Sequence, residues 1–295
     1  MTLYDELPVG AIDIHCHIDF ELSEEQMKRE PEAEWLPKAE AMGIRGVVLK
    51  SHWWPTANVV PYIVASVRTK VSVWSSVTLN PSVGGPNPCV IEACAAFGGK
   101  MAFLPTWSAR NDILRKGFSA RMPSYFREFG SMENSGFVFT NEAGEVLPIA
   151  RSLIESCKTR GLTLGSGHVS WQESVALARA ATEMKFGRFV INHPLSPMID
   201  APVDALRKIA ELGAFVEICW THLAPGRMDP VQLVGKMREI GLEQVIVSTD
   251  YFRPYSPSPP ELLRNFLGML HEGGLNREEI RRVACVNPAR ALALE

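Results

Sequence analysis

Residues 10–17 read Gly10-Ala11-Ile12-Asp13-Ile14-His15-Cys16-His17, a short apolar run that leads directly into two histidines. Alternate residues of an extended strand point to the same side, so both imidazoles leave the end of this strand together. Two convergent imidazoles on a rigid strand can serve as a preformed pair of metal ligands. Because an H-x-H pair also arises by chance, its interpretation depends on what lies at the ends of later strands.

Similar apolar runs recur along the chain and alternate with helical patterns. Runs such as Val47-Val48-Leu49 do not alternate with polar residues, which is typical of parallel strands covered on both faces. Ser170 with Glu173 indicates a capping box, and Asp229 before Pro230 indicates a helix start. The predicted strands are 11–15, 46–50, 71–78, 101–107, 162–166, 188–192, 214–220 and 244–250. Eight strand–helix units predict an α/β fold, a (β/α)8 TIM barrel that occupies residues 1–295 as one domain, rather than a doubly wound open sheet.

The segment at about 108–147 interrupts this rhythm. It is basic and aromatic, and the alternation in its last part, 137–146, predicts a small hairpin. A loop of this length in a compact domain is usually functional or disordered, and its aromatic content argues against disorder. We predict a lid-like insertion after the fourth strand, over the C-terminal face of the barrel, with no helix before Pro148.

The composition is that of an ordinary soluble enzyme, with 46% hydrophobic and 21% charged residues. A net charge of −3 implies no general attraction to nucleic acid or to an anionic membrane, and no apolar stretch reaches the ~20 residues of a membrane span. Residues 1–8 are polar and acidic, unlike a secretion signal, and six cysteines without a CxxC pattern are typical of buried free thiols in a reducing cytoplasm. We therefore expect a cytoplasmic enzyme with a small-molecule substrate as its partner. Assembly of the chain into a homo-oligomer stays an open alternative.

Polar residues gather at the ends of the predicted strands, where a TIM barrel places its chemistry. Six of the seven histidines lie there, and the seventh, His271, is interpreted as a surface residue of a helix. This clustering favours one shared site over six separate structural histidines, although an ordinary hydrogen-bonded role fits His52 and His222 equally well. The strand-end residues are His15, His17, Lys50, His52, His168, His193, Glu217, His222 and Asp250.

The order of an H-x-H pair after strand one, histidines after strands five and six and an aspartate after strand eight resembles the amidohydrolase superfamily of metal-dependent hydrolases. The closing Asn287-Pro288-Ala289-Arg290-Ala291-Leu292 is also similar to a motif of that superfamily. The resemblance implies a hydrolase of an amide, ester or lactone bond that holds one or two divalent ions of zinc, manganese or iron. The metal ligands that it implies are His15, His17, His168, His193 and Asp250. Asp250 would also be the general base for a metal-bound water.

Lys50 marks a departure from that superfamily. Two-metal members usually carry a carboxylated lysine or a glutamate at the end of strand four, where this chain has Leu104-Pro105-Thr106-Trp107. Lys50 stands at the end of strand two instead, and a carbamate on Lys50 could bridge two metal ions. Alternatively, Lys50 pairs with Glu217 or Asp250 or binds an anionic substrate, and a single metal ion then leaves His193 to contact the substrate. Asp250, His193 and Lys50 are therefore the candidate catalytic residues.

Substrate recognition is predicted from aromatic and polar side chains near the strand ends. Trp53 and Trp107 indicate an aromatic wall for a substrate with a sizeable apolar body, and Arg253 could clamp a carboxylate or phosphate. Asp13 is expected to support a ligand imidazole. The other candidate substrate-binding residues are His52, Glu217 and His222.

Other activities on the same scaffold stay open. Two irons could activate dioxygen to hydroxylate a bulky hydrophobic substrate, and a single metal ion beside an unmodified Lys50 fits a decarboxylase. A barrel that only binds a ligand is disfavoured, because five ligand candidates are intact.

Overall fold

The structure is a computed structural model that describes residues 3–19, 21, 30–124, 136–224, 226–252 and 256–294. Eight parallel strands form one sheet, in which each strand pairs with the next one along the chain. The strands are β1 (Ile12–His17), β2 (Gly46–Lys50), β3 (Ser72–Thr78), β4 (Met101–Phe103), β5 (Thr163–Gly165), β6 (Phe189–Ile191), β7 (Phe215–Cys219) and β8 (Val245–Ser248). All eight predicted strands are therefore confirmed, and the fold is a (β/α)8 TIM barrel.

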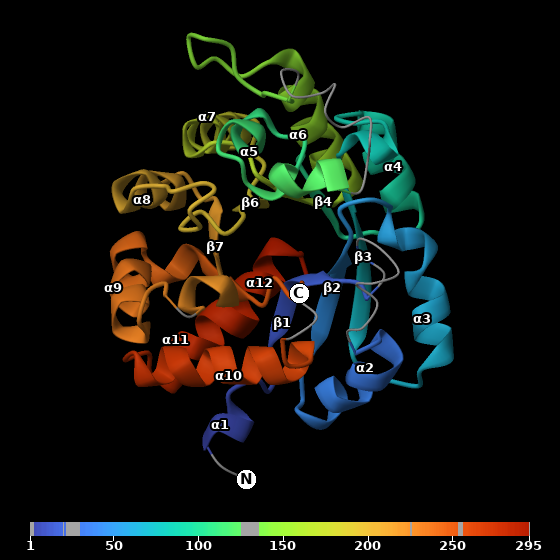
Figure 1. Cartoon of the computed structure of the whole chain (residues 1–295), viewed down its shortest axis with the longest axis vertical. Coiled ribbons are helices and arrows are strands. Elements are labelled where there is room, and N and C mark those ends of the chain that lie inside the picture. The colour runs from blue at the N-terminus through green and yellow to red at the C-terminus, as the bar shows by residue number, and fades with distance from the viewer. Residues whose placement is uncertain are drawn as a thin grey trace.

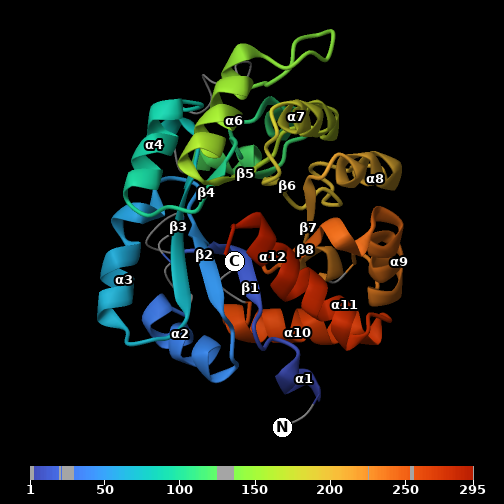
Figure 2. The same ribbon diagram turned by 180° about the vertical axis from the view of Figure 1, so that it is seen from behind.

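Helices surround the strands (Figures 1 and 2). The capping boxes and proline starts read from the sequence are present, with Ser170 accepting from Glu173 N and Asp229 from Gln232 N. The helices are α1 (Leu3–Glu6), α2 (Glu32–Ala41), α3 (Val60–Ser66), α4 (Pro88–Ala96), α5 (Arg110–Leu114), α6 (Pro148–Arg160), α7 (Trp171–Glu183), α8 (Val203–Glu211), α9 (Pro230–Ile240), α10 (Pro259–Glu272), α11 (Arg277–Arg281) and α12 (Asn287–Ala291).

The barrel closes where β8 meets β1. The backbone nitrogen of Asp250 donates to the His15 carbonyl at 2.9 Å, and that of His17 donates to the Tyr251 carbonyl at 3.1 Å. The Asp13 carboxylate accepts from the backbone nitrogens of His15 and Thr249 across this seam. The Asp13 oxygens thus bond the backbone of both strands and the Thr249 hydroxyl, and support of a ligand imidazole by Asp13 stays a prediction.

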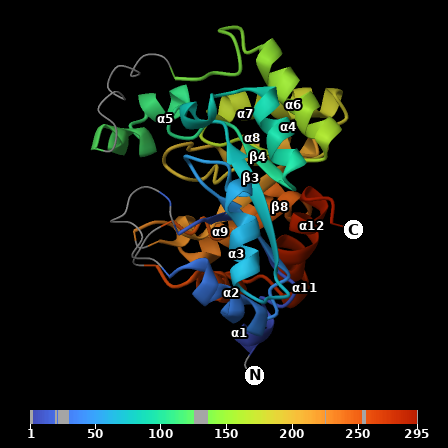
Figure 3. The same cartoon turned by 90° about the vertical axis from the view of Figure 1, so that its right-hand side faces the viewer.

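Two apolar layers stabilise the barrel. One lies between the sheet and the outer helices. The other fills the barrel interior, where Ala291 and Leu292, at the end of α12, belong to the same buried cluster as strand residues such as Ile12 and Met101. Figure 3 shows α12 and α5 on opposite sides of the barrel. The interior apolar layer occupies one end, so the carboxyl ends of the strands are left for polar side chains.

Several strands are shorter than predicted. The run 101–107 is a strand only to Phe103, because Pro105 lacks the backbone donor that the ladder needs. The run 244–250 ends at Ser248, since Asp250 has a left-handed backbone (φ 48°) that cannot continue a strand. Both departures leave the end residues on turns rather than on the strands themselves.

The segment after β4 contains helix, contrary to prediction. Helix α5 begins at Arg110, and a 3-10 helix, η4, spans Phe118–Ser124. The hairpin is present only as an isolated antiparallel bridge between Thr140 and Val146. Closure of this segment over a bound substrate stays a prediction.

All six cysteines are free. Four are buried, as the sequence analysis expects, but Cys89 is exposed and Cys285 is partly exposed.

Candidate metal centre

Three side chains from the seam between β1 and β8 meet at the carboxyl end of the barrel. Asp250 Oδ1 lies 3.2 Å from His15 Nε2 and 3.3 Å from His17 Nε2. All three atoms lie within 4.8 Å of one another. Ligand atoms held about 2.1 Å from one ion are about 3.0–3.4 Å apart, so these three positions could hold one divalent metal ion.

The strand geometry explains why these side chains converge. His15 and His17 alternate along β1, so their imidazoles leave the same side of the strand. Asp250 follows β8 in the left-handed region, which aspartate tolerates better than most residues. Its backbone bond to His15 therefore fixes the carboxylate directly over the tip of β1.

A buried carboxylate lies behind each of three histidines. His15 Nδ1 is 3.0 Å from Glu217 Oε2, and His17 Nδ1 is 3.1 Å from Glu21 Oε1. His168 Nδ1 is 2.7 Å from Asp112 Oδ2. A carboxylate that accepts from Nδ1–H fixes the tautomer and leaves Nε2 with a lone pair. Hydrogen bonds of this kind join His15 to Glu217 and His168 to Asp112, and they fit those two imidazoles to metal coordination through Nε2, whereas the contact of His17 with Glu21 is an ion-pair distance.

The electrostatics keep two of these carboxylates charged. Burial alone would raise the pKa of Glu217, but the charge and hydrogen bond of His15 lower that pKa to about 2. Burial likewise opposes ionisation of Asp112, yet the hydrogen bond and charge of His168 lower the pKa of Asp112 below its usual value. Both groups therefore act as hydrogen-bond acceptors.

His193 follows β6 and completes the group of imidazoles. Its ring centroid is 5.0 Å from that of His168 and 5.8 Å from that of His15. Burial, followed by the neighbouring charges of His168 and His15, lowers the pKa of His193 well below its usual value. Its buried Nδ1 has no hydrogen-bond partner among the described residues. A neutral imidazole with an unpaired buried nitrogen is a suitable ligand or substrate contact.

Lys50 is buried at the end of β2 and contacts His15. Its Nζ lies 2.9 Å from His15 Nε2 and 4.9 Å from the centroid of Phe103. Burial lowers the pKa of Lys50, whereas Asp250, Glu21 and Glu217 raise it in part. The amine therefore stands beside the nitrogen that would bind a metal ion.

His52 faces the same group from β2. Its Nδ1 is 2.9 Å from Thr106 Oγ1, and its Nε2 is 3.9 Å from Glu21 Oε1. His17, Glu21 and His52 also offer three ligand atoms within 4.8 Å of one another. Glu21 lies one helical turn's spacing after His17, a weak signal that the sequence reasoning missed.

The remaining predicted substrate contacts lie in different surroundings. Trp53 and Trp107 are buried and pack against each other at 5.0 Å in a cluster with Met122. Glu217 is fully buried and accepts from Asn192 as well as contacting His15. The Nδ1 of His222 lies 2.8 Å from the Cys219 carbonyl.

Arg253 lies outside the described residues.

Two phenylalanines cover the histidines. Phe118 stacks on His52 with ring centroids 4.6 Å apart, and Phe252 meets the Phe118 ring edge-on at 5.3 Å. Phe252 also contacts His17 at 5.1 Å. We call Phe118 and Phe252 the aromatic cover. Phe118 belongs to the aromatic segment at about 108–147 that the sequence analysis interprets as a lid, whereas the sequence reasoning missed Phe252, which follows β8 and is not part of that segment.

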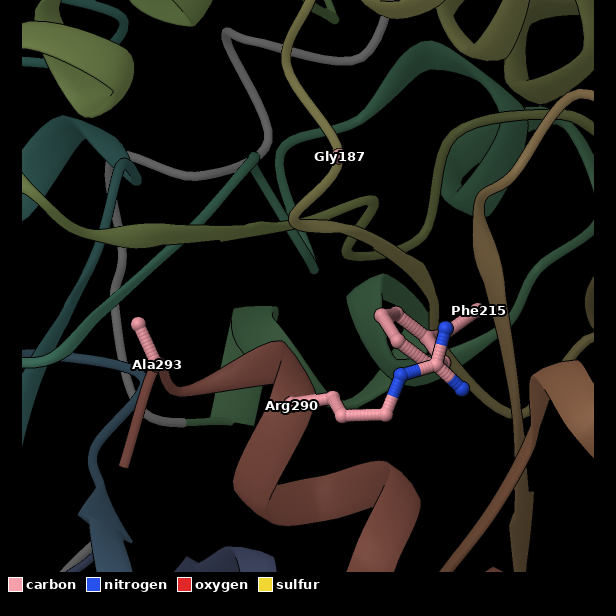
Figure 4. Close-up of a pocket in the computed structure, with 4 residues that line it drawn as sticks. All are labelled: Gly187, Phe215, Arg290 and Ala293. Atoms are coloured by element: carbon pink, nitrogen blue, oxygen red, sulfur yellow. The ribbon is translucent and has the colours of Figure 1, made fainter. Parts of the chain in front are cut away.

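A cavity of about 390 Å³ lies at the other end of the barrel (Figure 4). Gly187 and Phe215, which line it, stand at the amino ends of β6 and β7, and Arg290 and Ala293 come from the region of α12. Arg290 is already engaged, since it donates to the Glu243 carbonyl and lies over the Phe215 ring. This cavity is therefore separate from the strand-end histidines.

The fold and the site define a TIM barrel with a cluster of histidines and carboxylates at the carboxyl ends of its strands. The chain belongs to the family of unknown function DUF6282, which matches residues 10–217. No protein of curated function matches the sequence. In the described part of the chain, no helix has the length and apolar character to cross a membrane.

Solved structures with the same fold cover nearly the whole chain. An amidohydrolase from Pseudomonas aeruginosa has a TM-score of 0.64 and 11% identity over 98% of both chains. A probable dipeptidase from Pseudomonas aeruginosa has a TM-score of 0.66 and 11% identity over 98% of this chain and 96% of its own. A putative 2-pyrone-4,6-dicarboxylic acid hydrolase from Pseudomonas putida has a TM-score of 0.56 and 14% identity over 97% of this chain and 98% of its own. At these identities the likeness shows the fold.

Proposed function

We propose that this chain is a metal-dependent hydrolase of the amidohydrolase type, acting on an amide, ester or lactone bond of a small, partly apolar substrate. The position of Asp250 Oδ1 beside both His15 Nε2 and His17 Nε2 carries the proposal. The similar structures include a probable dipeptidase and a putative 2-pyrone-4,6-dicarboxylic acid hydrolase, which supports the reaction class and leaves the substrate open.

The proposed metal ligands divide into two groups. His15, His17 and Asp250 form one set of ligand atoms, and His168 with His193 could hold a second ion. Lys50 could join the two sets after carboxylation, in which Nζ bonds to the carbon of carbon dioxide and releases a proton. Without carboxylation, the amine must give up its contact with His15 Nε2 when that nitrogen coordinates an ion.

A divalent ion held there would lower the pKa of a water molecule and polarise the scissile bond. Asp250 is the general base in this proposal, because its side chain is 19% exposed whereas the His15 and His17 side chains are almost completely buried. It accepts the proton from water and passes it to the leaving group. His193 contacts the substrate when only one ion is bound, and the aromatic cover excludes water from the reacting bond.

Elemental mass spectrometry of protein purified without added metal tests the proposal first, followed by a hydrolysis screen with dipeptides, lactones and aryl esters. We expect at least one equivalent of zinc, manganese or iron, together with hydrolysis of one of these classes. Two irons per chain together with dioxygen consumption would indicate the oxygenase instead of the hydrolase. Release of carbon dioxide without hydrolysis would indicate the decarboxylase. No metal after soaking in zinc, manganese or iron would overturn the metal-dependent proposal.

His15→Ala/His17→Ala provides the matched variant for the metal measurement. It removes two Nε2 ligands from β1 and leaves the apolar strand positions intact. We expect its metal content to fall, and an unchanged content would place the ion elsewhere.

A further inference from the structure

Helix α5 lies across the loops that follow β5 and β6. Asn111 Nδ2 donates to the carbonyls of His168 at 3.0 Å and Met198 at 3.1 Å. Arg115 donates to the Pro197 carbonyl at 3.2 Å. The segment after β4 is therefore attached to the two loops that carry His168 and His193.

Asp112, on the same helix, reaches the imidazole itself. Its carboxylate is fully buried, with Oδ2 2.7 Å from His168 Nδ1. His168 in turn has a tight local backbone, because a Cβ on the preceding Gly167 would lie 2.2 Å from the Leu104 carbonyl oxygen. The backbone before His168 therefore has little freedom to move, and the contact with Asp112 sets the orientation of the His168 ring.

The same carboxylate holds the start of η4. The backbone nitrogen of Ser119 donates to Asp112 Oδ1 at 2.6 Å, and that of Phe118 donates to Oδ2 at 3.2 Å. A Cβ at Gly117 would lie 2.6 Å from Asp112 Oδ2, so the absence of a side chain there lets the turn approach the carboxylate. Two oxygens therefore serve three donors, one from the imidazole and two from the turn.

This turn places Phe118 in the aromatic cover. The Phe118 ring stacks on His52, and His52 lies beside His17 with ring centroids 4.6 Å apart. A shift of the turn would move Phe118 away from these rings, because the backbone nitrogens that bond Asp112 are those of Phe118 itself and of the next residue, Ser119.

We propose that Asp112 is a positioning residue that couples two features, the position of Phe118 over the site and the orientation of His168 for metal binding. This inference rests on the proposed function. A metal ion held by His168 Nε2 would make Nδ1–H a stronger donor to Asp112 and would hold the carboxylate in the position in which it also accepts from the turn. By thermodynamic reciprocity, a seated turn raises the metal affinity of His168 by the same factor.

Asp112→Asn tests this coupling because it keeps the size of the side chain. One carboxamide oxygen cannot accept from all three donors, and the amide NH2 is itself a donor. We expect metal affinity to fall by about 10–100-fold, and hydrogen exchange at the Phe118 and Ser119 amides to become faster. In the wild type, zinc should slow exchange at those amides, and in Asp112→Asn this effect should be lost.

Two matched variants distinguish a loss of coupling between metal binding and the turn from a general loss of packing. Glu217→Gln alters the carboxylate behind His15 without touching the turn, so it should weaken metal binding and leave exchange at Phe118 and Ser119 unchanged. Asn111→Ala removes a bond to the His168 carbonyl but keeps the Nδ1 contact, so zinc should still protect the turn. Loss of zinc protection in all three variants, each measured at a zinc concentration that saturates it, would assign the effect to packing and overturn the coupling.

The wild-type protein offers a measurement that needs neither metal nor a variant. Long-range 1H–15N spectra of the imidazoles should show His168 with its proton on Nδ1, and the Ser119 amide should exchange slowly. A proton on Nε2 would overturn the role of Asp112 even if metal binds. Absence of metal binding with the proton on Nδ1 would instead refute the proposed function and leave the contact intact.

Discussion

Lys50 Nζ lies 2.9 Å from His15 Nε2, the same nitrogen that lies 3.2 Å from Asp250 Oδ1. A buried amine and a partly exposed carboxylate therefore meet at one imidazole nitrogen, and metal binding at that nitrogen must change the position or the chemistry of Lys50.

We predict that Lys50→Ala binds one metal equivalent fewer than the wild type and that millimolar acetate restores part of the activity. A small carboxylate can enter the space of the missing side chain and replace the carbamate oxygens. Metal content and hydrolysis measured with and without acetate check this prediction. Unchanged stoichiometry would instead assign Lys50 to substrate binding. Lys185→Ala serves as the control, since Lys185 lies in the exposed turn after α7.

Asp250→Asn should fold and lose about 10²–10⁴-fold in kcat. The backbone bond from residue 250 to His15 is retained, so the melting temperature should change little, whereas the general base is lost. Asp200→Asn is a matched control, because Asp200 has a similar left-handed backbone but an exposed side chain. Equal activities of the two variants would exclude Asp250 as the base.

Acid should destabilise the metal-free protein partly through Glu217. The folded pKa of Glu217 is lowered to about 2 from a usual value of 4.5, so its contribution to stability is present above pH 4.5 and is lost as the pH falls toward 2. Urea unfolding of the wild type and Glu217→Gln across this range should show a shallower pH dependence for the variant. Glu211→Gln, at an exposed position on α8, should follow the wild type.

Gly167→Ala should destabilise the protein by about 2–4 kcal/mol and lower its metal content. Gly167 has φ 57°, and a Cβ there would meet backbone oxygens of Leu104 and Pro105 at 2.2 and 2.5 Å. The backbone must then shift, and His168 would move with it. Gly187→Ala is the control, because a Cβ at Gly187 meets nothing within 4 Å. Thermal unfolding and metal analysis together separate the two effects, and equal behaviour of both variants would contradict the prediction.

The barrel could be predicted because its signal is local and repeated. Runs such as 46–49 are apolar throughout and are bounded by polar residues, so each strand is recognisable in isolation. The residues at the strand ends follow from the same reasoning, since a barrel brings all carboxyl ends to one face. Assignment of residues 1–295 to one domain with an insertion at about 108–147 stays a prediction.

The carboxylates behind the imidazoles could not be predicted in the same way. Asp112 lies on a short helix in a segment that lacks strong helical periodicity, and its distance from His168 in the chain gives no signal of contact. Glu217 was expected to contact substrate, but its place inside β7 turns it toward His15 and Asn192. Side-chain pairing across the barrel depends on strand register, which the sequence pattern does not specify.

The β1–β8 seam also has a consequence for the order of events during synthesis. His15 emerges from the ribosome early, whereas Asp250 emerges only after all the intervening strands, and the two are neighbours only once the ring is complete. A nascent chain in which β8 has not yet been synthesised therefore lacks Asp250 and with it the full set of proposed ligands, even if the earlier strands have already paired. If the proposed metal site exists, it can therefore form in full only after Asp250 has been synthesised and β8 has joined β1.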